Sequence, residues 1–196
     1  MGKIVISANA TLDGVVQDPD GQEGFGPGGW FHRFVAVEDL QAWTTNETGE
    51  VLHAEALLLG RRSYDWFATR MHGADVRVSP EWADTMNGRP KYAVSSTLEN
   101  PEWNNTTVLN GDAAKEISEL KRRVDGDILV YGSYQLVRTL LAEHLADELR
   151  LTVFPVVLGS GQRLFDKIGD TTPLRLADTR KIGDGLVFCT YEFLYG

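Results

Sequence analysis

Two short apolar runs constrain the fold most, because each one ends at a glycine and leads directly into a helical pattern. The first is Ala56–Gly60, and the second is Asp127–Tyr131, which Gly132 follows. Runs of this length are typical of strands buried on both faces, and such strands occur in parallel sheets covered by helices. The two runs therefore predict an α/β fold.

Strands and helices alternate along the chain up to about residue 145. Apolar runs predict further strands over residues 3–8, 91–95 and 106–109. Helical periodicity predicts helices over residues 63–69, 80–86, 112–124 and 133–141, with Asp112 and Ser133 as N-caps. Residues 31–55 are also broadly helical, and we expect a break at residues 46–49, where a glycine interrupts the pattern.

The last quarter of the chain has a different pattern. Residues 148–157 predict a strand, and residues 174–181 and 186–193 flank Ile182-Gly183-Asp184-Gly185, which is typical of a hairpin turn. We therefore expect one α/β domain over residues 1–196, with a mostly parallel sheet, helices on both faces and an antiparallel C-terminal hairpin.

Acidic residues outnumber basic ones, 28 to 19, which gives a net charge of −9. Duplex DNA and anionic membranes attract a basic face, so this balance disfavours nucleic acid and membranes as main partners. A small anionic ligand needs only a few local cations and is compatible with it. The N-terminus lacks a secretory signal, and no apolar stretch approaches the ~20 residues that span a bilayer, so we expect a cytoplasmic protein.

Several familiar kinds of site are absent from the sequence. The single cysteine, Cys189, excludes an intrachain disulfide and a zinc site built on two or more cysteines. The four histidines form no H-E-x-x-H pair, so we expect no metal. There is no G-x-S-x-G motif, no phosphate loop, and no G-x-G-x-x-G after the first strand.

The first glycine junction, Gly60-Arg61-Arg62-Ser63, has the features of a phosphate site. Free N–H groups at the start of a helix favour an anion, and guanidinium groups add charge-assisted hydrogen bonds. The alternative is a pair of solvated surface arginines.

The second junction, Gly132-Ser133, has a related design. Gly132 allows a pyrophosphate to approach the backbone, and Ser133 supplies a hydroxyl that caps the helix or donates to a ligand. An ordinary strand-to-helix turn is the alternative. Two such junctions in one sheet favour a dinucleotide.

Asp13 follows the first predicted strand, at the edge where open α/β sheets bind ligands. A carboxylate there can hydrogen-bond a heterocycle or assist proton transfer, although an aspartate before glycine is also a common turn residue. Residues 18–30 form a glycine-rich loop, which is either a lid or a mobile surface excursion.

These residues together resemble the dihydrofolate reductase-like superfamily, and most closely the reductase domain of bacterial riboflavin biosynthesis in a stand-alone form. The resemblance covers residues 3–193. Its carriers are T-L-D-G at 11–14, L-G-R-R-S-Y at 59–64, S-S-T-L at 95–98, V-Y-G-S at 130–133 and P-V-V-L-G-S-G-Q-R-L-F at 155–165.

The resemblance implies a dihydrofolate reductase-like fold and an NADPH-dependent reductase, with a homodimer as a family expectation. The positions that match the cofactor-binding pattern are Gly60, Arg61, Arg62, Ser63, Ser95, Ser96, Gly132 and Ser133.

The resemblance also implies a site for a small-molecule substrate. Asp13 matches the residue that faces the substrate, and residues 159–165 match a loop at the sugar end of the pocket. Gly161 and Arg163 in that loop are candidates to bind a substrate phosphate, since glycine exposes backbone N–H groups and arginine grips phosphate. Loop placement adds Trp30 and Phe34 as walls of the site.

The sequence departs from the family pattern at two places, which leaves the identity of the substrate open. Ser63 stands where threonine is commoner, and Tyr131-Gly132-Ser133 replaces a run of glycines. The zinc deaminase half of the riboflavin enzyme requires several cysteines, so it is absent. The nearest reaction is reduction of 5-amino-6-(5-phosphoribosylamino)uracil. Reduction of a pterin or folate, and nucleotide binding without turnover, are the alternatives.

Overall fold

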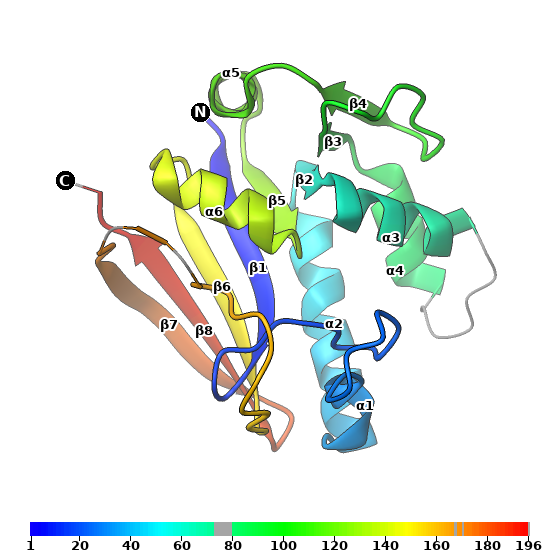
Figure 1. Ribbon diagram of the computed structural model, residues 1–196, viewed down its shortest axis with the longest axis vertical. Coiled ribbons are helices and arrows are strands. Elements are labelled where there is room, and N and C mark those ends of the chain that lie inside the picture. The colour runs from blue at the N-terminus through cyan, green and yellow to red at the C-terminus, as the bar shows by residue number, and fades with distance from the viewer. Residues whose placement is uncertain (73–79, 167, 170, 196) are drawn as a thin grey trace. The chain divides into compact units, whose positions relative to one another are not determined.

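The computed structural model describes residues 1–72, 80–166, 168–169 and 171–195. Within these residues the chain forms eight strands and six helices (Figure 1). The strands are β1 (Lys3–Thr11), β2 (Ala56–Gly60), β3 (Lys91–Val94), β4 (Thr106–Leu109), β5 (Asp127–Tyr131), β6 (Glu148–Phe154), β7 (Leu174–Ile182) and β8 (Leu186–Phe193). The helices are α1 (Trp30–Arg33), α2 (Val37–His53), α3 (Arg61–His72), α4 (Pro80–Gly88), α5 (Ala113–Arg123) and α6 (Tyr134–Ala142).

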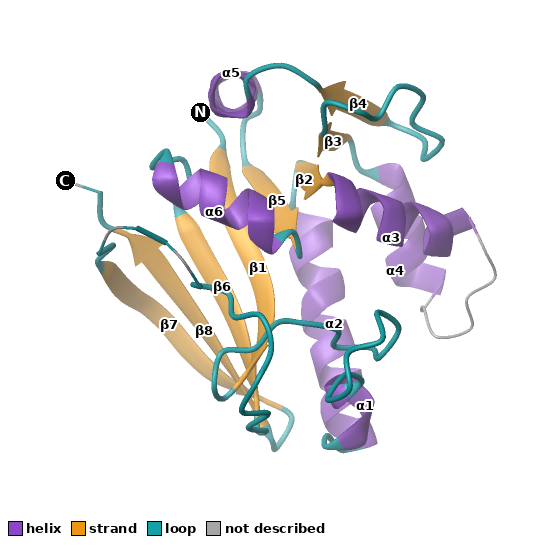
Figure 2. Ribbon diagram, viewed as in Figure 1, coloured by secondary structure: helices purple, strands orange, loops and turns teal. Residues whose placement is uncertain are grey.

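The strands follow the order β4-β3-β2-β5-β1-β6-β8-β7. Pairing is parallel between β4 and β3, β3 and β2, and β2 and β5, and it is antiparallel between β6, β8 and β7. Helices α3 and α4 connect β2 to β3 and α5 connects β4 to β5, whereas residues 95–105, which contain no helix, connect β3 to β4 (Figure 2). The predicted α/β class, with its antiparallel C-terminal hairpin, is confirmed.

The chain divides into two compact units. The first comprises Met1–Ile6 and Thr48–Asp147, and the second comprises Ser7–Glu47 and Glu148–Gly196. Both β1 and α2 begin in one unit and end in the other. A single domain over residues 1–196 stays a prediction.

The core of the first unit is built on β2 and its neighbours. Leu57 and Leu59 of β2 are fully buried and pack with side chains of β3, β5, α3 and α4. The aromatic members of this cluster are Tyr64, Phe67, Trp103 and Tyr131. Burial on this scale stabilises the unit by the hydrophobic effect, at about 25 cal/mol per Å² of apolar surface removed from water.

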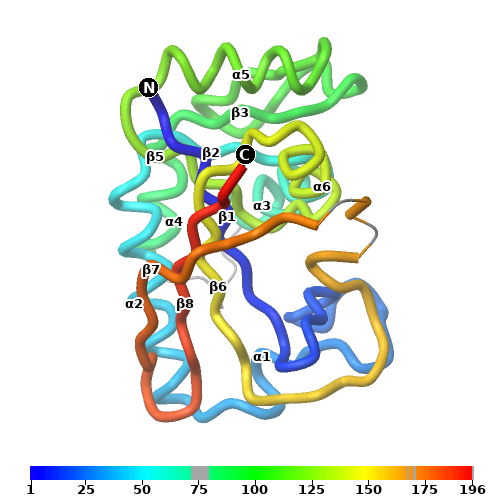
Figure 3. The backbone as a smooth tube through the Cα atoms, turned by 90° about the vertical axis from the view of Figure 1, so that its left-hand side faces the viewer, coloured from blue at the N-terminus to red at the C-terminus, as the bar shows by residue number. Residues whose placement is uncertain are grey.

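The core of the second unit is an aromatic cluster beside the C-terminal hairpin. Trp30, Phe154, Leu186 and Phe188 are its buried members, together with Ile182. Figure 3 shows β7 and β8 side by side, joined by the turn at Gly183. Because Gly183 has a φ of 57° and a side chain there would collide with the Asp39 carboxylate, the turn requires glycine.

The predicted break at residues 46–49 is wrong, because α2 runs unbroken through them. Gly49 faces open space, and an isolated glycine costs a helix only about 1 kcal/mol. Val51 in the last turn of α2 and Ala54 directly after the helix are buried, and this burial opposes the cost. The break lies earlier, between α1 and α2. None of the described helices is long and apolar enough to cross a membrane.

Candidate functional site

The two glycine junctions lie at the same edge of the sheet in the first unit. Strands β2 and β5 are parallel neighbours, with Leu58 opposite Val130. Helix α3 begins directly after Gly60, and α6 begins two residues after Gly132. The ends of both strands and the N-termini of both helices are therefore brought together, as a site for an anion requires.

Ser133 joins the two junctions. Its Oγ accepts a hydrogen bond of 2.8 Å from the backbone N–H of Gly60. Ser133 stands at the N-cap position of α6, as predicted, but its φ of 61° places it in the left-handed region and its side chain makes no capping hydrogen bond. The hydroxyl retains its own proton and can still donate to a ligand.

Ser63, from the first junction, lies close to Gly132 of the second junction. Its Oγ lies 3.2 Å from where a Cβ on Gly132 would stand, and Gly132 has a φ of 62°. A Cβ on Gly60 would likewise lie 3.2 Å from the Ser133 Oγ. Gly60, Ser63, Gly132 and Ser133 thus form one compact group, which we call the glycine–serine cluster. Side chains on its glycines would fill the space beside the hydroxyls.

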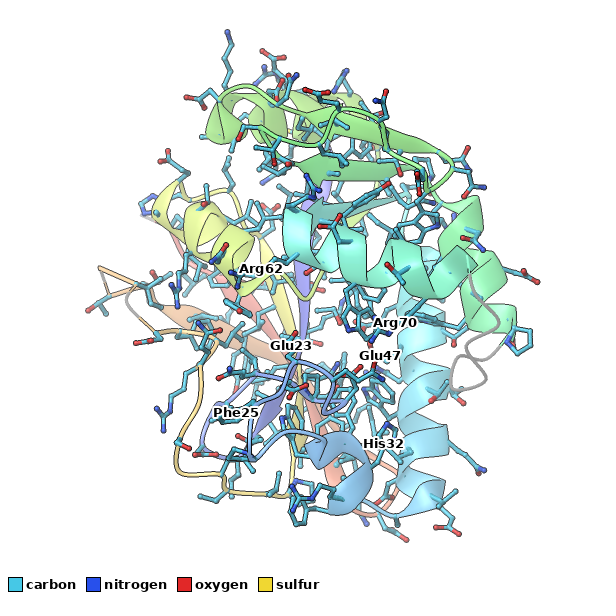
Figure 4. The ribbon with its side chains drawn as sticks, turned by 45° about the vertical axis from the view of Figure 1, so that its right-hand side comes forward. Glu23, Phe25, His32, Glu47, Arg62 and Arg70 are labelled. Atoms are coloured by element: carbon cyan, nitrogen blue, oxygen red, sulfur yellow. The ribbon has the colours of Figure 1, made fainter. Side chains whose placement is uncertain are left out.

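The two arginines beside this cluster differ. The Arg61 Nε donates to both carboxylate oxygens of Asp65, at 3.0 and 2.8 Å, and its Nη1 donates to the Thr97 Oγ at 3.2 Å. Arg62 is exposed at the start of α3 (Figure 4) and makes no hydrogen bond or ion pair with any residue of the described ranges. Of the two arginines, Arg62 is therefore the one whose guanidinium is available to bind an anion.

Ser95 and Ser96 follow β3. The Ser95 side chain is buried, and its Oγ accepts hydrogen bonds of 3.2 Å from the N–H groups of Thr97 and Leu98. It therefore shapes the turn that presents Thr97 to Arg61. Ser96 is exposed. The sequence analysis missed Thr97 and Asp65, although the spacing of Arg61 and Asp65 by four residues in a helix is a signal for an ion pair.

Asp13 lies in the second unit, after β1. Its carboxylate accepts hydrogen bonds from the Thr11 hydroxyl at 2.7 Å and from the N–H groups of Leu158 and Gly159 at 3.2 and 2.9 Å. The Thr11 hydrogen bond lowers the pKa of the Asp13 carboxyl, with help from the two N–H groups and against the desolvation that raises it. Asp13 is thus an ionised group that holds the loop after β6.

Arg163 is bound to Asp13. Its Nε donates to the Asp13 carbonyl oxygen at 3.0 Å, and its Nη2 lies 3.7 Å from the Asp13 carboxylate. The side chain of Arg163 also borders a cavity of about 280 Å³ in the second unit. The other residues that line this cavity are Ala10, Gly14, Leu151, Leu164, Phe165 and Asp166.

Gly161 is required by close packing. Its φ is 120°, and a Cβ there would lie 2.7 Å from Val15 and 2.9 Å from the ring of Phe25. Phe25 belongs to the glycine-rich loop (Figure 4). Buried Asp18 organises this loop, since its carboxylate accepts hydrogen bonds from the N–H groups of Glu23 and Phe25 at 2.9 and 3.0 Å. The loop sequence alone did not single out Asp18.

The two aromatic residues expected at the substrate lie in different surroundings. The Trp30 side chain is 0% exposed, packs against Phe31 and Phe154, and donates from its indole to the Gln17 carbonyl oxygen at 2.9 Å. Trp30 is therefore part of the core of the second unit. Phe34 is 48% exposed, and the Arg33 guanidinium lies 5.1 Å from its ring centre.

Among the residues that the structure describes, no group of three or more histidine, cysteine, aspartate or glutamate side chains is arranged to hold a metal ion. The polar groups described above are hydroxyls, guanidinium groups and backbone N–H groups at glycines. These donors suit an anionic organic ligand.

Sequence comparison gives two relatives in Bacillus subtilis (strain 168). The uncharacterized protein YyaP is 27% identical over 192 residues, which are 97% of this chain and 95% of YyaP. The uncharacterized protein YwjB is 26% identical over 184 residues, which are 94% of each chain.

Solved structures share the fold. A Shewanella sp. PV-4 protein named for riboflavin biosynthesis has a TM-score of 0.70 at 19% identity, covering 98% of this chain and 99% of its own. A pyrimidine reductase-like protein of Corynebacterium diphtheriae has a TM-score of 0.59 at 15% identity, covering 99% and 92%. RibD of Acinetobacter baumannii has a TM-score of 0.61 at 15% identity, and the match covers 99% of this chain but 58% of RibD.

The family assignment comes from a profile of the RibD C-terminal domain, which matches residues 2–188. The matched range includes the glycine–serine cluster and the Asp13 loop. It confirms the resemblance drawn from the sequence motifs. The chain therefore belongs to the RibD C-terminal domain family.

Proposed function

We propose that this protein is an NADPH-dependent reductase of a small polar substrate, closest to 5-amino-6-(5-phosphoribosylamino)uracil. One observation carries the proposal: the hydrogen bond from Gly60 to Ser133 joins two strand–glycine–helix junctions into a single cluster. Two helix N-termini and two hydroxyls at one place suit the pyrophosphate of a dinucleotide. Membership of the RibD C-terminal domain family supports the same ligand.

The residues of this site fit NADPH. Side chains on Gly60 and Gly132 would occupy the space beside the two hydroxyls, so glycine keeps the backbone open to a phosphate. Ser63 and Ser133 would donate hydrogen bonds to the pyrophosphate. Arg62, with Arg61 beside it, would bind the adenosine 2′-phosphate, and Ser95 and Ser96 would lie at the adenosine end.

When bound, the reduced nicotinamide supplies the hydride. The protein binds and orients the reactants. Asp13 is bonded to three donors that favour its ionised form, so we assign it a positioning role rather than proton delivery. It fixes the loop that carries Gly161 and Arg163, the candidates for binding substrate. Trp30 acts by packing, and Phe34 offers an exposed ring.

Ligand titration and steady-state kinetics test this function. The wild-type protein should bind NADPH more tightly than NADH, and it should oxidise NADPH when given the phosphoribosylaminouracil. Arg163→Ala should raise KM for that substrate while NADPH affinity is retained.

The alternative outcomes assign the protein differently. Oxidation with dihydrofolate alone identifies a pterin or folate reductase. Tight NADPH binding without oxidation of either substrate identifies a nucleotide-binding protein or a different substrate. Equal binding of NADPH and NADH contradicts the cofactor assignment.

A further inference from the structure

Tyr131 is the last residue of β5 and stands directly before Gly132 of the glycine–serine cluster. Its side chain is only 7% exposed. The ring packs edge-on against Phe67 of α3 and Trp82 of α4, with centroid distances of 5.9 and 6.5 Å. Tyr131 thus brings a phenol into an aromatic cluster at the carboxyl end of the sheet.

The hydroxyl of Tyr131 is buried and has no hydrogen-bond partner among the described residues. Tyr64 belongs to the same cluster and differs in this respect, because its hydroxyl accepts a hydrogen bond of 3.1 Å from the backbone N–H of Trp103. A buried hydroxyl without a partner destabilises the folded protein, whereas a phenylalanine would fill the same space without that cost. The Tyr131 hydroxyl therefore needs an explanation other than packing.

The surroundings of the hydroxyl restrict what it can bind. Aromatic rings make a site that disfavours a charged group, because burying an uncompensated charge is costly. The same rings suit a flat heterocycle, which packs against them by stacking or edge contacts. A phenol donates well to a neutral carbonyl oxygen.

We propose that the Tyr131 hydroxyl is a ligand-binding group, which donates a hydrogen bond to an amide carbonyl of a flat heterocycle bound at the end of β5. This inference rests on the proposed function, which places a dinucleotide at the adjoining Gly132. Two chemical groups meet this requirement. One is the carboxamide of the nicotinamide, and the other is the ring carbonyl of a uracil or pterin substrate.

Tyr131→Phe tests the proposal, with Tyr64→Phe as the matched control in the same cluster. Tyr131→Phe should leave the Tm of the ligand-free protein unchanged or raise it, because it removes a hydroxyl that has no partner. It should weaken heterocycle binding by about three- to tenfold, the effect of one neutral hydrogen bond. Tyr64→Phe should lower Tm, because the Trp103 N–H loses its acceptor.

Titration with different ligands distinguishes the nicotinamide carboxamide from the substrate ring carbonyl as the acceptor. Weaker binding of NADPH, with unchanged binding of 2′,5′-ADP, which lacks nicotinamide, identifies the carboxamide. A higher KM for the uracil or pterin substrate, with unchanged NADPH affinity, identifies the substrate ring.

Unchanged affinity for every ligand overturns the inference, as does a fall in Tm equal to that of Tyr64→Phe, which would show a structural partner. If the wild-type protein binds no NADPH, the proposed function fails. The inference is then decided by titration with nicotinamide and uracil alone, where equal binding by wild type and Tyr131→Phe overturns it.

Discussion

The Ser133 Oγ accepts a hydrogen bond from the Gly60 N–H across 73 positions of sequence. The bond satisfies a backbone donor at the point where β2 ends and α3 begins, where helix geometry offers no backbone acceptor within α3. It also fixes the spacing of the two helix N-termini. Under the proposed function, stability and cofactor binding are therefore coupled at Ser133.

Ser133→Ala should lower both properties. Loss of the hydroxyl leaves the Gly60 N–H without its acceptor and should reduce the free energy of unfolding by about 1–2 kcal/mol. NADPH affinity should fall as well. Denaturant unfolding and ligand titration measure the two effects. Ser118→Ala is the control, since this α5 serine makes its own hydrogen bond to Ala114 at 2.8 Å but lies outside the cluster. An unchanged NADPH affinity would remove Ser133 from the cofactor site.

The two arginines should contribute differently to cofactor choice. Arg62→Ala should weaken NADPH binding about tenfold or more, the cost of one charge-assisted contact, and leave NADH affinity unchanged. Arg61→Ala should have a smaller effect, because Asp65 already neutralises part of its charge. Arg122→Ala, an exposed arginine in the last turn of α5, is the control. Equal losses for NADPH and NADH would contradict binding of the 2′-phosphate.

Asp65→Asn should strengthen NADPH binding. The Asp65 carboxylate lies 2.8 Å from the Arg61 Nε, and it would repel a phosphate bound beside Arg61. Exposed ion pairs of this kind are worth about 0–1 kcal/mol, so the gain should be at most about fivefold. Fluorescence titration with NADPH and NADH measures it. Weaker NADPH binding would instead show that Asp65 orients Arg61 for the phosphate.

Local signals in the sequence were enough to predict the strands, most helices and the two glycine junctions. An apolar run that ends at a glycine is a pattern of adjacent residues, so it can be recognised without knowledge of the fold. The predicted bounds of β2 and β5 are therefore the observed ones. Contacts between distant residues were not predictable in this way. Asp13 binds the N–H of Gly159, 146 positions away, and only the fold brings the two together. The burial of Trp30 has the same origin, since its neighbour Phe154 comes from β6.

Asp13 should make folding stability depend on acidic pH. Its pKa in the folded protein lies below the ordinary value of 3.8. The stabilisation is therefore present above about pH 4 and is lost as the pH falls through the folded pKa, because protonation weakens the hydrogen bonds that the carboxylate accepts from Thr11, Leu158 and Gly159. Asp13→Asn should abolish this part of the acid dependence, as measured by Tm against pH. An identical acid profile in the variant would show that Asp13 carries none of it.

Lys91 should produce a pH dependence of the same sign at alkaline pH. Its side chain is 0% exposed, and its ammonium donates to the carbonyl oxygens of Met86, Asn87 and Arg89 at 2.9, 3.1 and 2.7 Å. Burial lowers the pKa of Lys91 from 10.5 to about 8.

Between these two values the unfolded chain binds the proton more tightly than the folded protein does, so the free energy of unfolding should rise with pH over that range. Other lysines and tyrosines also titrate there, and the comparison with Lys91→Met isolates the contribution of Lys91. Denaturant unfolding between pH 7 and about pH 10 should show a steeper rise for the wild type than for the variant, up to the unfolded-state lysine pKa of about 10.4. Parallel curves would mean that Lys91 has the same pKa in the folded and unfolded states, because the three carbonyl oxygens stabilise its ammonium as well as water does.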